Sequence, residues 1–166
     1  MTVRTTERPS LELAGEYPGV VSVSVWKNLG ICSWTGGAVG PAVDTVASAM
    51  DKLHATAART SWVHLIQDGL PLPDSAARSG FIRIMKERTT ELACVAIVVG
   101  GTGFWASAMR NAVIGLRVFA PRSFDFRLHG THEEVVRWLP EAHREKTGVQ
   151  ISPESLARLL SQVRPA

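Results

Sequence analysis

The stretch at 111–139 constrains the fold of this chain more than any other part of the sequence. It holds the end of an apolar helix, a short strand of alternating apolar and polar residues at 124–128, and a second helix opened by Thr131. An almost continuous apolar run at 92–99 precedes it, which is typical of a central strand covered on both faces. This order is the last βαβα unit of an open α/β sheet, so it indicates a fold but not a reaction.

Two periodicities predict the other elements. Alternation of apolar and polar residues indicates a hairpin of two strands near the start, and spacing of three to four residues indicates helices. The Thr131 helix carries Glu134 three residues on, the arrangement of a capping box. The further predicted strands lie at 20–26, 31–34 and 62–67, and the further helices at about 41–58, 74–88, 103–119 and from Ser152 onward.

These elements predict one α/β domain. We expect a mixed five-stranded sheet, in which the N-terminal hairpin joins parallel strands, packed with about four helices and an extra short C-terminal helix. Residues 1–16 are polar without clear periodicity and predict a loose leader. The domain then spans 17–140, and 141–166 hold a polar linker and the last helix, whose leucine stripe either docks on its own domain or pairs with a second subunit.

Composition narrows the class of protein. The chain of 166 residues is 45% hydrophobic and 20% charged, which is ordinary for a soluble globular domain, and we expect it in the cytoplasm. No apolar run approaches the ~20 residues of a spanning helix, so no stable membrane insertion is expected. The net charge of +3 comes from bases scattered among acids, which argues against nucleic acid as a partner.

The element order resembles the STAS-type fold, and more closely the STAS/SEC14-like group that includes bacterial proteins similar to the sporulation anti-anti-sigma factor. The resemblance covers about 20–139 and rests on motifs that specify architecture better than function. The matching segments are the strands at 62–67 and 93–99, the helix opening at Asp74 and Ser75, and the run from Gly115 to Leu139. The resemblance implies a non-enzymatic regulatory module that acts through a protein partner and uses no cofactor. A homodimer is one form that such a module can take.

The resemblance also implies a modification site. In that family an Asp-Ser pair at a helix N-terminus carries a regulatory phosphate, and Asp74 and Ser75 fall at that place. A phosphate there would be stabilised by the helix dipole and would alter a partner surface. Either residue can instead serve only as the helix cap. The interaction surface expected on this basis lies around 68–79 and the adjacent third helix.

A second function class follows from the turn at Gly100–Trp105. Gly101, Thr102, Gly103 and Trp105 belong to a match to the dinucleotide fingerprint, placed between a strand and a helix. The alternative prediction is therefore a domain that binds a small molecule, a nucleotide or an apolar ligand, at this turn. The simpler interpretation is a structural glycine turn, because a single fingerprint outside the first strand is weak.

No catalytic or metal-binding residue is predicted. His129 and His132 lie three apart, but neither a cysteine nor a carboxylate completes a ligand set. His54 and His64 show no nucleophile and acid arranged with them, although a triad assembled only in space stays open. Cys32 and Cys94 are predicted to be core residues, since their spacing fits neither a metal site nor a redox motif.

Overall fold

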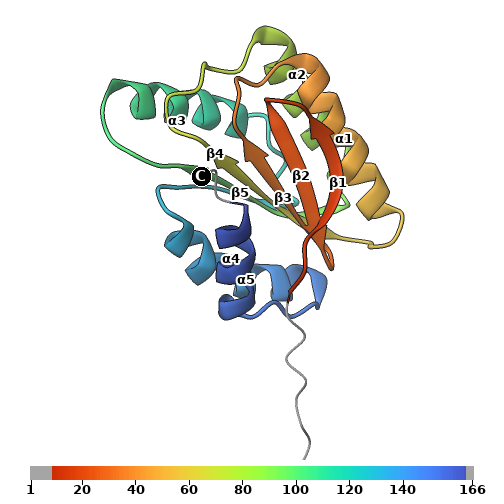
Figure 1. The fold of residues 1–166 in the computed structure, drawn as a ribbon. Coiled ribbons are helices and arrows are strands. Elements are labelled where there is room, and N and C mark those ends of the chain that lie inside the picture. Colours follow the sequence, from red (N-terminus) through yellow and green to blue (C-terminus); the bar gives the residue numbers. More distant parts are fainter. Residues whose placement is uncertain (1–8, 164–166) are drawn as a thin grey trace, which may run out of the picture.

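The computed structural model describes residues 9–163, which form six strands and five helices (Figure 1). Strands and helices alternate after the first three strands, as the hydrophobic periodicities predict. The elements are β1 (Glu12–Tyr17), β2 (Val21–Trp26), β3 (Leu29–Trp34), α1 (Gly40–His54), β4 (Thr60–Ile66), α2 (Ser75–Glu87), β5 (Leu92–Val99), α3 (Phe104–Arg117), β6 (Asp125–His129), α4 (His132–Thr147) and α5 (Pro153–Gln162).

The sheet is mixed and its strand order follows the chain, from β1 to β6. β1, β2 and β3 pair antiparallel, and β3 to β6 pair parallel. Helices α1, α2 and α3 cover one face, and α4 and α5 cover the other (Figure 1). The predicted α/β class, the hairpin and the parallel strands are confirmed. None of the helices within 9–163 has both the length and the apolar character needed to cross a membrane.

The predicted count of five strands is wrong, because β1 adds a sixth. Its residues fall mostly within the predicted leader, of which 1–8 lie outside the described residues. A register shift between Leu13 and Gly15 breaks the alternation that would reveal a strand in the sequence. Ala14 and Tyr17 pack against the core, while Leu13 stays exposed. β1 is an edge strand with an interrupted pattern, which is why periodicity alone misses it.

The stretch from 141 that was predicted as a linker is helical. α4 continues through Pro140 to Thr147, although proline removes one helical hydrogen bond. Ala142 and His143 are buried beyond the proline, so packing supports the second half of the helix. Gly148, with a φ of 75°, then ends α4 in the left-handed conformation.

Two hydrophobic cores flank the sheet, and α5 belongs to the second. Leu156, Leu159 and Leu160 have exposed fractions of 0–1% and pack with residues of α4 and the strands. The apolar stripe of the last helix therefore docks on its own domain. The first core, between the sheet and α1 to α3, contains the site described below.

Candidate functional site

The loops that follow the parallel strands meet at the carboxyl edge of the sheet. The indole N–H of Trp105, at the start of α3, donates to the carbonyl of Leu70 at 2.6 Å. This contact joins the two segments that the sequence singled out, 68–79 and 100–105. Gly101, Thr102 and Gly103 are exposed beside it. Ligand sites of open α/β sheets lie outside the carboxyl ends of the strands, so this edge is the first place to look.

The glycine turn before α3 is held by neighbouring protein groups. Gly101 and Gly103 have φ values of 79° and 94°, a region that glycine enters without steric cost. The guanidinium of Arg110 donates to the carbonyls of Val99 and Gly101 at 3.0 and 2.7 Å. A methyl group placed on Gly101 would lie 3.5 Å from Oδ2 of Asp68. That carboxylate would repel a nucleotide phosphate at the turn.

Asp74 and Ser75 differ in their contacts at the start of α2. Asp74 caps α2, since its Oδ1 accepts a hydrogen bond from the backbone N–H of Ala77 at 2.7 Å. Ser75 is the first helical residue and is exposed. The capping interpretation holds for Asp74, and the hydroxyl of Ser75 is not used for it. Phosphorylation of Ser75 stays a prediction.

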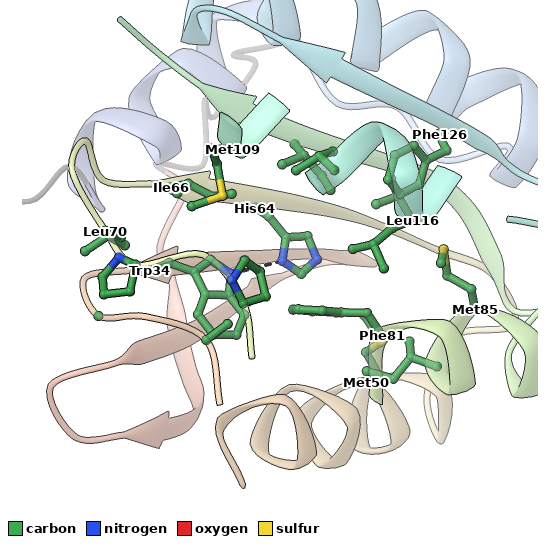
Figure 2. Close-up of a pocket in the computed structure, with 18 of the residues that line it drawn as sticks. Trp34, Met50, His64, Ile66, Leu70, Phe81, Met85, Met109, Leu116 and Phe126 are labelled. Carbon is green, nitrogen blue, oxygen red and sulfur yellow. Dashed lines mark hydrogen bonds between the residues drawn. The ribbon is translucent and has the colours of Figure 1, made fainter. Parts of the chain in front are cut away.

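An apolar pocket lies below this edge, between the sheet and helices α1, α2 and α3 (Figure 2). Its cavity volume is about 70 Å³. A single water molecule needs roughly 10–15 Å³ of cavity volume. The pocket therefore has room for one compact organic molecule. Its lining consists of Trp34, Gly36, Ala38, Met50, His64, Ile66, Leu70, Pro71, Pro73, Phe81, Ile84, Met85, Leu92, Val95, Ile97, Met109, Val113, Leu116 and Phe126.

The exposure of the lining residues shows where the pocket opens. Gly36 and Ala38 in the β3–α1 loop, and Leu70 and Pro71 in the β4–α2 loop, are partly or fully exposed. The lining residues of β5 and β6 are buried. We therefore place the mouth of the pocket at the carboxyl edge of the sheet, where Trp105 donates to the carbonyl of Leu70.

Trp34, His64 and Phe81 form an aromatic wall inside the pocket. The ring centroids of Trp34 and Phe81 lie 5.7 Å apart, and those of His64 and Phe81 6.1 Å apart, both edge to face. The indole N–H of Trp34 donates to Nδ1 of His64 at 3.1 Å. This bond uses the indole donor, so His64 brings the only other polar side-chain group to the lining.

The hydrogen bond from Trp34 fixes the tautomer of His64. Nδ1 is the acceptor, so the hydrogen of the neutral ring sits on Nε2. Burial lowers the pKa of His64 to about 4, and the ring is neutral at pH 7. No group within 9–163 forms a hydrogen bond with Nε2. Figure 2 shows the imidazole ring projecting among the other lining residues.

The opposite core contains a line of polar side chains that resembles a catalytic arrangement. His143 lies 2.6 Å from Oγ of Ser61 through Nδ1 and 2.9 Å from Oδ1 of Asn28 through Nε2. The Asn28 amide donates to the carbonyl of Arg59, so its oxygen accepts from His143. Ser61 and His143 have exposed fractions of 0%. A nucleophile must reach its substrate, so we assign this cluster a structural role.

His129, at the end of β6, contacts an aromatic and an acidic side chain. The ring of His129 lies 5.2 Å from that of Trp138 at a tilt of 35°, and its Nδ1 lies 3.8 Å from Oε2 of Glu134. Burial lowers the pKa of His129. Across the described part of the chain, no three His, Cys, Asp or Glu side chains are grouped as metal ligands.

No protein-family model and no curated protein matches the chain. The resemblance to the STAS/SEC14-like group therefore stays a prediction.

The sequence predicts most of the pocket residues as core residues, but it does not predict the cavity between them. Phe81 and Met85 are predicted to face the sheet, and Met109 falls on the apolar stripe of α3. Two signals were available in the sequence: one histidine inside an apolar strand, and three methionines on three successive helices. Methionine adapts to irregular spaces, and a histidine in an apolar strand needs a partner.

Proposed function

We propose that this protein binds a small apolar molecule in the pocket between the sheet and helices α1 to α3. The observation that carries the proposal is an apolar cavity that opens at the carboxyl edge of the parallel strands. Apolar cavities of this kind stay dry and take up apolar ligands. Open α/β sheets bind their ligands at this edge.

The chemistry of the lining supports binding without reaction. His64 is neutral and no other titratable side chain lines the space, so the pocket offers neither a charged group nor a paired acid and base. A ligand in this apolar space would make dispersion contacts with the surrounding side chains. Met50, Met85 and Met109 give the walls side chains that can adjust to a ligand.

Two other predictions are set against this one. A nucleotide at the glycine turn is disfavoured by the Asp68 carboxylate beside it. A regulatory module that acts through a protein partner or as a homodimer stays a prediction, and the exposed Ser75 near the pocket mouth is compatible with it. We favour ligand binding because the apolar cavity supports it directly.

The proposal is tested by extracting the protein purified from its native cells. We expect denaturation and extraction into organic solvent to release a small apolar compound from the natural protein. Val113→Phe adds a ring to the lining from α3, fills the cavity and should release none. Ile114→Phe adds the same ring at the next position, which is half exposed, and should leave the yield unchanged.

Mass spectrometry of the three extracts decides the result, and unfolding curves check that both variants are folded. Equal yields from the natural protein and from a folded Val113→Phe variant would contradict binding in this pocket. A yield that Ile114→Phe also abolishes would place the ligand on the outer face of α3.

A further inference from the structure

We infer that the ligand of this pocket is a neutral, mainly apolar molecule with one hydrogen-bond acceptor, such as the oxygen of a ketone, aldehyde, ester or ether, which Nε2–H of His64 binds. The inference rests on the proposed function and adds the chemical class of the ligand. It follows from one donor in a lining that is otherwise apolar.

Nε2–H of His64 is a hydrogen-bond donor at the wall of the pocket. His64 is 6% exposed, and its Nε2 is not one of the side-chain atoms of 9–163 that lack both a partner and accessible surface, so part of its surface borders the pocket. It has no hydrogen-bond partner in that part of the chain and projects into the pocket (Figure 2). A donor that borders an apolar cavity finds no acceptor on the cavity walls, and leaving it unpaired is unfavourable. A ligand acceptor would satisfy it.

The lining of the pocket offers no charged side chain to a ligand. A carboxylate in this pocket would be buried without a cation, because no lysine or arginine lines the cavity. Such a burial is strongly unfavourable. His64 cannot supply the charge at neutral pH, since burial favours its neutral form. These observations favour an uncharged oxygen over the anion of a fatty acid.

Neighbouring aromatic rings fix the position of the His64 donor. Trp34 holds Nδ1 of His64 at 3.1 Å, and the two rings lie nearly parallel, at 16°. Phe81 packs edge-on against both rings. The imidazole is therefore oriented before a ligand enters, and its hydrogen bond requires little rearrangement.

Two probes of nearly equal shape test the inference with the full chain. Acetophenone carries a carbonyl where α-methylstyrene carries a CH₂ group. We expect the ratio of the dissociation constants, α-methylstyrene over acetophenone, to fall by about threefold to tenfold in His64→Phe, as for the loss of one hydrogen bond. His64→Gln should retain most of the ratio, because its amide can accept from Trp34 and donate to the ketone.

Nitrogen-15 labelling of the histidines gives a readout that needs no variant. The Nε2 proton of His64 should move downfield when acetophenone is added and stay in place with α-methylstyrene. A ratio unchanged between the natural protein and His64→Phe, or equal responses to the two probes, would overturn this inference and leave the pocket as a binding site. If neither probe binds the natural protein, the proposed function itself fails.

Discussion

Lowering the pH from 7 to 4 is expected to reduce the free energy of unfolding by about 6 kcal/mol through His64 and His143 alone. Burial lowers the pKa of each ring to about 4, from an ordinary value of 6.5. Between pH 6.5 and 4 the two histidines are protonated in the unfolded chain and neutral in the folded protein. Stability is therefore retained above pH 6.5, falls between pH 6.5 and 4, and levels off below. Each histidine contributes about 3 kcal/mol.

Structure explains why both rings resist protonation. Nδ1 of His64 accepts from Trp34, and His143 lies fully buried between Ser61 and Asn28. A second proton on either ring would remove an acceptor and bury a charge. Burial also lowers the pKa of His54, which adds to the effect in the same direction.

Denaturant unfolding at pH 7, 6, 5 and 4 measures this dependence. His64→Gln and His143→Gln should each remove close to half of the slope, whatever they do to absolute stability. A free energy of unfolding that stays constant between pH 6.5 and 4 would show that these rings titrate normally in the folded state.

The second large effect is expected at Gly30, where alanine should cost about 3 kcal/mol or prevent folding. Gly30 in β3 stands beside Trp62 in β4. A Cβ atom on Gly30 would overlap Cζ3 and Cε3 of the Trp62 ring. That ring is fully buried and its N–H donates to Thr60 at 2.8 Å, so it has no free space to enter.

A double-mutant cycle separates this overlap from a general effect of alanine. Trp62→Leu should be destabilising by itself, and Gly30→Ala should then add little to it. Gly115→Ala is the matched control, because a Cβ there meets nothing and α3 gains a better helix former. Additive costs of Gly30→Ala and Trp62→Leu would contradict the assigned contact.

The order of the elements was predictable because most of them keep a clean period. The Thr131 cap is an example: its Oγ1 accepts from the N–H of Glu134 at 3.3 Å. The Glu134 carboxylate, however, accepts from Gly130 at 2.8 Å, one residue before the expected partner of a capping box. Local hydrogen bonding of this kind follows from residue type and spacing, with an error of about one residue.

The pocket could not be predicted in the same way. Phe81 is predicted to face the sheet and packs, partly buried, against the first core, and His64 is buried beside it. A cavity remains or closes according to shifts of about one ångström between side chains on several helices. The hydrophobic periodicity of a sequence does not encode such shifts. The glycine fingerprint lies close to the pocket, because Trp105 donates to the carbonyl of Leu70, but none of its residues lines the pocket.

Binding of a ligand in the pocket is the central prediction. Labelling the methionine methyl groups with carbon-13 tests this directly, because Met50, Met85 and Met109 contribute to the lining from α1, α2 and α3. Titration with acetophenone should shift all three resonances with one common dissociation constant, and Val113→Phe should abolish the shifts while Ile114→Phe keeps them. Three resonances that stay unmoved in the folded natural protein, up to the solubility of the probe, would contradict the account.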